Sequence, residues 1–272
     1  MSLRTGYDAV AVMPQREEAL SITMSNSDEE RFSPRTLARI LGVAGLLGIV
    51  AGAFDIGYVQ STVIVLGNPA ATLHNILAHE TLFRMGFSAH LFELLLNILG
   101  EILTFYLFRR VNIFIAATAL CCGIVGISVE AVDLLSAYVP LKLAIDGSAL
   151  GSFSPEQLYA LADFSAQVQR AGLLLSFVFY GVDEIATGLL MFRSAFLPRV
   201  LGALLGLSGL CYFSHGFLSF LAPALDARLY PYILYPCLPG EGLSSLWFAT
   251  VGLNVVKWRA WTPAPRSEAS LV

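Results

Sequence analysis

Long runs of apolar residues alternate with short polar segments along most of the chain. A helix needs about 20 mainly apolar residues to cross roughly 30 Å of hydrocarbon. We predict six such spans, at about residues 37–59, 86–108, 112–137, 171–192, 198–222 and 233–256. The predicted fold is an all-α polytopic membrane helical bundle.

We expect one six-span membrane domain at residues 36–258. It is flanked by a polar tail at 1–35, predicted to be disordered, and a cytoplasmic tail at 259–272. The first 33 residues are polar and contain no apolar core of signal-peptide length, so the first span is expected to direct insertion.

Composition supports a membrane protein. Of 272 residues, 56% are hydrophobic and 13% are charged, with a mean hydropathy of +0.71, whereas ordinary soluble domains carry about 25% charged residues. The lipid bilayer is therefore an expected partner. The basic residues lie scattered at the ends of apolar runs, which argues against a nucleic-acid partner.

The basic residues also predict the topology. In the six-span arrangement, 12 of the 16 lysines and arginines fall on one side, and Arg84, Lys142, Arg170 and Arg228 fall on the other. Cytoplasmic loops carry an excess of Lys and Arg. We therefore predict a multi-pass protein of the plasma (inner) membrane with the N-terminus and the C-terminus both cytoplasmic.

Two connections carry local signals. In "SPEQ", Ser154 can cap a helix, Pro155 can take its first position and Gln157 can complete a capping box. If that helix runs unbroken to Arg193, its 39 residues measure roughly 58 Å and must project beyond the membrane. The segment at 68–84 is expected to lie along the outer surface.

The last predicted span is interrupted by "YPCLPGEG". Proline cannot donate a backbone hydrogen bond, and glycine relaxes the backbone. This pattern predicts a helix that starts late or is broken. The alternative is an ordinary loop that ends at Pro239.

One apolar segment, "AHLFELLLNILGEIL", carries a polar stripe. His90, Glu93, Asn97 and Glu101 fall within an arc of about 80° on a helix. A charged side chain at the bilayer centre costs at least about 2.5 to 3.5 kcal/mol, so such residues face the bundle interior or water. We predict that this stripe faces inward.

Other spans add polar residues, and counting 1.5 Å per residue from the cytoplasmic arginines sorts them into two tiers. The outer tier holds Asp55, His90, Glu93, Glu130, Asp133, His215 and Glu241, the inner tier holds Glu101, Asp183 and Glu184, and Asn97 lies between them. We predict that the outer tier and Asn97 form an acidic site that opens outward. The inner tier is predicted to be a proton or cation path.

Five acids and two histidines in the outer tier cannot all be charged in a low dielectric, so some acids are expected to be protonated, shared or balanced by a bound cation. One hypothesis is a site for a lipid-like or cationic small molecule. A second is a proton-coupled carrier, in which acids exchange protons through Asn97 and water.

Two further hypotheses stay open. One is a membrane enzyme that acts on a lipid or isoprenoid by acid or metal catalysis, with His90 and Glu93 as candidate metal ligands. The other is a structural subunit whose polar groups hold helices together, at about 0.6 kcal/mol each. Catalytic residues, cofactors and oligomeric state stay unassigned.

Three segments carry a family resemblance: "NILAHETLFRMGF" at 75–87, "FYGVDEIATGLLMFRSAFLPRVLGALLGLSGLCY" at 179–212 and "GEGLSSLWFATVG" at 240–252. They resemble bacterial domain-of-unknown-function family 4386, over roughly residues 36–257. The resemblance implies a small helical inner-membrane bundle and assigns no reaction, cofactor or partner.

Individual positions refine the resemblance. Glu241 and Arg84 match the family pattern, and Arg84 is expected to pair with an acid at the mouth of the site. The chain departs from the pattern at His90, where an aspartate is usual, and at Glu93 and Glu101, which replace apolar residues. These departures make this chain more acidic than the pattern implies.

Overall fold

The computed structural model describes residues 33–65, 67–146 and 153–261. The predicted tails at 1–35 and 259–272 lie largely outside these ranges. The described residues contain no strand, so the all-α prediction is confirmed. In chain order the helices are α2 (Pro34–Gly52), the π-helix η1 (Ala53–Gln60), α3 (Ser61–Val63), α4 (Pro69–Ala78), α5 (Glu80–Phe108), α6 (Ile113–Asp146), α7 (Pro155–Arg193), α8 (Arg199–Leu221), α9 (Pro223–Leu229), the 3-10 helix η2 (Tyr232–Leu234), α10 (Cys237–Thr250) and α11 (Val255–Arg259).

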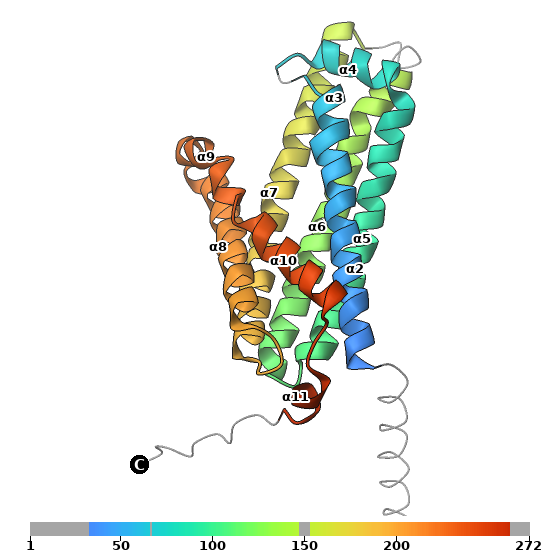
Figure 1. Cartoon of the computed structure of the whole chain (residues 1–272). Helices are drawn as coiled ribbons and strands as arrows, with labels where there is room; N and C mark the ends of the chain where they lie inside the picture. Colours follow the sequence, from blue (N-terminus) through green and yellow to red (C-terminus); the bar gives the residue numbers. More distant parts are fainter. Residues whose placement is uncertain (1–32, 66, 147–152, 262–272) are drawn as a thin grey trace, which may run out of the picture.

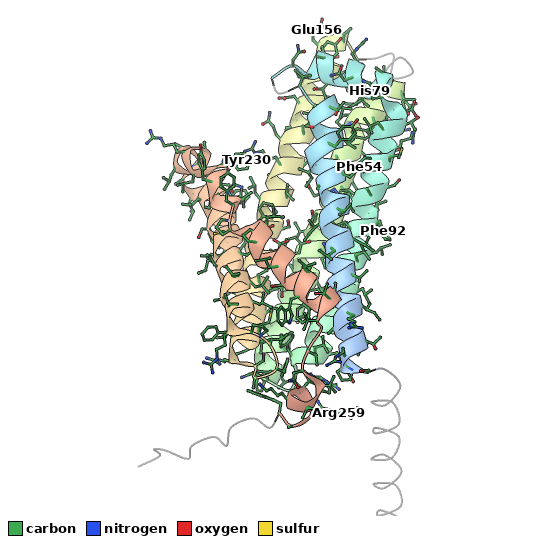
Figure 2. The ribbon with its side chains drawn as sticks, viewed as in Figure 1. Phe54, His79, Phe92, Glu156, Tyr230 and Arg259 are labelled. Carbon is green, nitrogen blue, oxygen red and sulfur yellow. The ribbon has the colours of Figure 1, made fainter. Side chains whose placement is uncertain are left out.

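Among the residues that the structure describes, five continuous helical segments are long and apolar enough to cross a membrane. They are Pro34–Val63, Glu80–Phe108, Ile113–Asp146, Pro155–Arg193 and Arg199–Leu221. Many of their outward side chains are large and apolar, such as Phe92 on α5, which is 49% exposed in the isolated chain (Figure 2). A multi-pass membrane protein follows from these helices, since their apolar surfaces need lipid around them.

The long helices run up and down in chain order, so that each packs against the next (Figure 1). The start of α2 and all of α11 lie together at one end of the bundle, which we call the terminal end. The helix α4, which belongs to the segment at 68–84, lies across the opposite end; its position along the outer surface of the membrane stays a prediction. Figure 2 shows His79 and Glu156 at that opposite end and Arg259 at the terminal end.

The sixth predicted span, at 233–256, takes a shorter form. Its helix α10 has 14 residues, which is about 21 Å and less than a full crossing. It begins at Cys237, next to Pro236, and includes Pro239 in its first turn. Proline is tolerated there because the backbone N–H groups of the first turn have no hydrogen-bond partner within the helix. The predicted late start is confirmed, and α10 runs obliquely from the middle of the bundle to the terminal end (Figure 1).

The helices α6 and α7 extend far beyond α8. A capping box at Ser154 starts α7, which continues for 39 residues to Arg193 as predicted, while α6 has 34 residues and α8 has 23. These lengths correspond to about 58, 51 and 34 Å. Only α8 matches the roughly 30 Å of a hydrocarbon layer. We call the part of α5, α6 and α7 beyond the level of α9, together with α4, the head (Figure 1).

An apolar cluster closes the terminal end of the bundle. Its buried members include Leu107, Phe108, Met191, Phe248 and Trp258, which come from α5, α7, α10 and α11. The indole Nε1 of Trp258 donates to the backbone oxygen of Leu107 at 2.8 Å. The interior above this cluster is where the polar residues gather.

Candidate functional site

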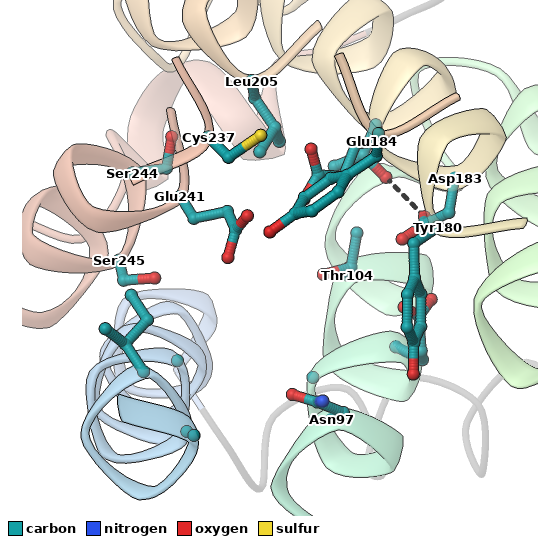
Figure 3. A pocket seen from close by; sticks show the side chains of 18 of the residues that line it. Asn97, Thr104, Tyr180, Asp183, Glu184, Leu205, Cys237, Glu241, Ser244 and Ser245 are labelled. Atoms are coloured by element: carbon teal, nitrogen blue, oxygen red, sulfur yellow. Dashed lines mark hydrogen bonds between the residues drawn. The ribbon is translucent and has the colours of Figure 1, made fainter. Parts of the chain in front are cut away.

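A cavity of about 500 Å³ lies in the middle of the bundle, above the terminal cluster, and we call it the central cavity. Its lining comes from α2, η1, α5, α6, α7, α8, η2 and α10. Figure 3 shows Asn97 and Thr104 of α5, Asp183 and Glu184 of α7 and Glu241 of α10 around one hollow. Helices distant in the sequence therefore build one site.

Acidic groups dominate the polar lining. Six carboxyl groups line the central cavity, those of Glu93, Glu101, Glu130, Asp183, Glu184 and Glu241. Among the described residues, the lining includes no lysine, arginine or histidine. Asn97, Thr104, Tyr180, Thr187, Tyr212, Ser244 and Ser245 add amide and hydroxyl groups. The central cavity is thus rich in acceptors for a cation or for hydrogen-bond donors.

Contacts within α7 and between neighbouring helices hold several of these acids in place. The Ser208 hydroxyl on α8 donates to Glu184 Oε2 at 2.5 Å, and the Thr187 hydroxyl donates to Asp183 Oδ1 at 3.2 Å. The carboxyl group of Glu101 lies against Gly123 of α6, where a Cβ atom would overlap it. Glycine at this position gives Glu101 the room to lie between α5 and α6.

Four other oxygens in the cavity, three carboxyl and one hydroxyl, have no partner. The buried atoms Glu93 Oε2, Glu101 Oε2, Glu241 Oε1 and Ser244 Oγ make no hydrogen bond within the protein. The large majority of buried side-chain polar atoms in folded proteins do have a partner. Since all four residues line the central cavity, these atoms are available to a ligand there.

A second set of polar residues forms a hydrogen-bonded chain across four helices, which we call the His90 chain. His90 Nδ1 lies 2.9 Å from Asp55 Oδ2, and His90 Nε2 lies 3.0 Å from Glu130 Oε1. Gln60 Nε2 donates to Asp55 Oδ2 at 3.0 Å, and the Tyr180 hydroxyl donates to Glu130 Oε2 at 2.6 Å. The His90 chain therefore links η1, α5, α6 and α7.

Local backbone structure brings Asp55 to this position. Asp55 belongs to the π-helix η1, and π-helical turns are rare and frequent at functional sites. A Cβ atom on Gly86 of α5 would lie 2.6 Å from Asp55 Oδ1, so only glycine lets η1 approach α5 this closely. The close approach brings the Asp55 carboxyl within reach of the His90 ring.

A smaller cavity of about 100 Å³, the head cavity, lies on the other side of the His90 chain. Asp55, Gln60 and His90 form part of its lining, together with residues such as Thr72 of α4 and Gln169 of α7. Glu130 lines the central cavity instead. The two cavities thus meet at His90 and its two carboxyl partners.

Two predicted site residues lie apart from both cavities. His215 Nδ1 lies 2.6 Å from Asp226 Oδ1, which joins α8 to α9, and the His215 ring stacks on Tyr230 with centroids 5.7 Å apart. Asp133 is buried against Gly172 of α7. The predicted outer tier therefore divides among the central cavity, the His90 chain and these two positions, while the predicted inner tier joins Glu93 and Glu241 in the central cavity.

The structure also adds residues that the sequence did not single out. Tyr180 lies three residues before Asp183 on one helix face, which is a signal that could have identified it. Asp226 lies beyond the predicted fifth span, where nothing marked it as a partner for His215. Arg84 was expected to pair with an acid at the mouth of the site. It pairs instead with Glu80 on its own helix at 2.7 Å, and both side chains are exposed on the surface of the head.

Metal ligation was one of the hypotheses. Both ring nitrogens of His90 face carboxyl groups, while Glu93 Oε2 lies without a partner in the central cavity. In the ranges that the structure describes, no group of three or more His, Cys, Asp or Glu side chains is arranged to hold a metal ion.

The central cavity reaches the surface on the lipid-facing side. Its lining includes Ile56 of η1 and Leu238 of α10, which are 46% and 67% exposed. The helix α10 packs against both α2 and α8, which themselves make no substantial contact over the described residues. The rim between η1 and α10 is therefore apolar, although the interior is acidic.

Comparison with known proteins gives one match. A family model described as "Domain of unknown function (DUF4386)" matches residues 40–252. No curated protein and no solved structure matches this chain. The match covers every residue that lines the central cavity, from Leu41 of α2 to Phe248 of α10.

Proposed function

Because this chain belongs to the DUF4386 family of domains of unknown function, matched over residues 40–252, we propose its function from its own geometry. The protein binds a cationic amphiphile, such as a lipid-like amine, in the central cavity. The cationic group lies among the carboxyl groups, and the apolar part extends through the rim toward lipid.

The observation that carries this proposal is the acidic composition of the lining. Six carboxyl groups and no basic side chain face the central cavity among the described residues. Charges buried in a low dielectric need compensation, and leaving one uncompensated is strongly destabilising. A bound cation supplies that compensation, and the carboxyl groups of Glu93 and Glu241, each with one unpartnered oxygen, lie beside its charge.

Size and access support an amphiphile over a bare ion. The volume of about 500 Å³ falls within the range of roughly 300 to 1,000 Å³ that is common for small-molecule pockets. Ile56 and Leu238, at the rim, are apolar and exposed. A ligand with an alkyl chain can leave the bilayer through this rim without crossing water.

We also propose that the terminal end faces the cytoplasm of a plasma (inner) membrane and that the head faces outward. Described basic residues at the helix ends support this orientation by the positive-inside rule. Those near the terminal end are Arg35, Arg39, Arg109, Arg110, Arg193, Arg199, Lys257 and Arg259. Because the apolar cluster closes that end, the central cavity then communicates with the outer half of the membrane.

Calorimetry of the full chain in lipid nanodiscs tests the binding site. The probe is dodecyltrimethylammonium, and dodecanol is the neutral comparison with the same alkyl chain. Glu241→Gln is expected to weaken binding of the cation at least tenfold (about 1.4 kcal/mol), because it removes from the lining a carboxyl group that has one unpartnered oxygen. Asp146→Asn, at an exposed acid paired with Lys142, is the matched control.

Two results would overturn the proposal. One is equal affinity for the cation and for dodecanol, which would make the alkyl chain the only determinant. The other is a Glu241→Gln variant that folds and binds the cation as tightly as wild type.

A further inference from the structure

His90 lies between the two cavities and contacts an acid on each side. Asp55, which meets Nδ1, lines the head cavity, and Glu130, which meets Nε2, lines the central cavity. The two contacts measure 2.9 and 3.0 Å. These distances are those of hydrogen bonds along which a proton can transfer.

Burial leaves few other routes between the two acids. Asp55, His90 and Glu130 are 5%, 3% and 7% exposed. The shortest connection between the two carboxyl groups is therefore the imidazole ring. An imidazole can accept a proton at one nitrogen and donate one from the other, which makes histidine a proton shuttle.

We propose that Asp55, His90 and Glu130 form a proton relay that exchanges protons between the head cavity and the central cavity. The relay rests on the proposed function, because it supplies the protons that replace a cation when the cation leaves the central cavity. It also makes the bound cation and protons compete for the same carboxyl groups.

The transfer balances without any other reactant. A protonated Asp55 gives its proton to Nδ1 of a neutral His90 whose Nε2 carries hydrogen, while Nε2–H gives its proton to the Glu130 carboxylate. One O–H bond breaks at Asp55 and one forms at Glu130, and the ring ends neutral as the other tautomer. Protons move the opposite way when a cation displaces them from the central cavity.

Neighbouring groups keep the relay aligned. Gln60 donates to Asp55 from η1, and Tyr180 donates to Glu130 from α7, so each carboxyl group is held by a donor other than His90. The other acidic groups near the relay are Glu93 of α5, which lies in the central cavity, Asp133 of α6, and Asp163 of α7, which lines the head cavity. Charge on any one of them alters the balance between the two ends of the relay.

The relay also lies at the depth where water and the membrane interior meet. Eighteen residues of α5 separate His90 from its end at Phe108, which is about 27 Å along the helix. A hydrocarbon layer of about 30 Å that starts at the terminal end would therefore end near His90. The head cavity then lies on the aqueous side of this boundary, and most of the central cavity lies within the hydrocarbon layer.

Infrared measurement after a pH jump tests the relay without any ligand. The full chain in lipid nanodiscs is mixed from pH 8 to pH 5, and the carboxylic-acid C=O band reports protonation of buried acids with time. His90→Gln is expected to slow this phase at least tenfold, because the amide cannot pass a proton. Asp55→Asn, which keeps an acceptor for the ring but cannot take a proton, is expected to slow it equally.

His215→Gln is the matched control, since His215 is equally buried and also paired with an aspartate, and it is expected to leave the rate unchanged. Wild-type rates in both relay variants would overturn the relay, as would a wild-type protein whose buried acids do not change between the two pH values. Calorimetry with dodecyltrimethylammonium on the same samples reports the proposed function separately, so either hypothesis can fail while the other holds.

Discussion

Two buried histidine and aspartate pairs lie in this protein, and they differ in what surrounds them. His90 and His215 are each 3% exposed, and their Nδ1 atoms lie 2.9 and 2.6 Å from Asp55 and Asp226. The other nitrogen of His90 meets Glu130 across the bundle. The ring of His215 instead packs between Tyr230 and Phe177, with centroids 5.7 and 5.8 Å away.

The difference teaches that the pair alone does not define a role. Asp226 follows His215 by 11 residues and ties α8 to the next helix, which is a structural contact. Asp55 precedes His90 by 35 residues, and the contact lies where two cavities meet. A second acid and a cavity on each side distinguish a route for protons from a link between two helices.

The largest expected effect comes from breaking the structural pair. Asp226→Ala leaves His215 Nδ1 buried without its hydrogen-bond partner, which costs about 1 to 3 kcal/mol, and the loss of a buried carboxyl group adds a packing cost. We expect a free energy of unfolding lower by these two costs together, with binding of dodecyltrimethylammonium unchanged within about twofold. Chemical unfolding measures the stability, and calorimetry measures the binding. A variant that is as stable as wild type, or that no longer binds the cation, would contradict a purely structural role for the His215–Asp226 pair.

Added methyl groups beside each histidine are expected to act next most strongly. Gly86→Ala brings a Cβ atom 2.6 Å from Asp55 Oδ1, and Gly216→Ala brings one 2.8 Å from the Leu174 backbone oxygen. Each overpacked variant should lose about 1 to 3 kcal/mol of stability. Only Gly86→Ala should also slow protonation of the buried acids after a pH jump, so equal rates in both variants would argue against the relay.

Glu130→Gln tests the one acid that belongs to both the relay and the central cavity. We expect affinity for dodecyltrimethylammonium to fall about tenfold (about 1.4 kcal/mol), and the proton-transfer phase to slow in the same variant. Asp226→Asn is the control and should change neither. A Glu130→Gln variant with only one of the two defects would separate the His90 chain from the cation site.

Tyr180→Phe is expected to have the smallest effect. It removes the 2.6 Å hydrogen bond to Glu130 Oε2, and such bonds between membrane helices contribute about 0.6 kcal/mol on average. Stability measured by chemical unfolding should fall by about that amount. Tyr58→Phe, at a side chain that is 56% exposed, should be neutral; a loss several times larger for Tyr180→Phe would mean that the tyrosine orients the whole relay.

Sequence patterns were sufficient for most of the fold. Hydropathy located the five long helices, and the capping box at Ser154 gave the start of α7. The pattern did not show that α10 would be too short to cross, because apolar content continues through Pro236 and Pro239 while the helix does not begin until Cys237. An apolar segment can therefore be longer than the helix it forms where prolines interrupt the segment.

The site was less accessible to sequence reasoning. The polar stripe on α5 has a period near 3.6, so its inward face could be inferred. Asp55 lies in a π-helix, where that period fails and the face taken by a residue cannot be counted. His90 and Glu93 line different cavities because different helices lie opposite them: η1, with Asp55, lies opposite His90, and α10, with Glu241, lies across the central cavity from Glu93. The periodicity of one helix does not show which helix lies opposite it.

The position of α10 has a consequence for biosynthesis. This helix contributes Glu241 and Ser244 to the central cavity and packs on α2, more than 180 residues earlier in the chain, while bridging to α8. During translation α2 to α8 enter the membrane before residues 237–250 have been made. The binding site therefore does not exist in the growing chain, and nascent α2 must keep an open face in the bilayer until the much later helix reaches it.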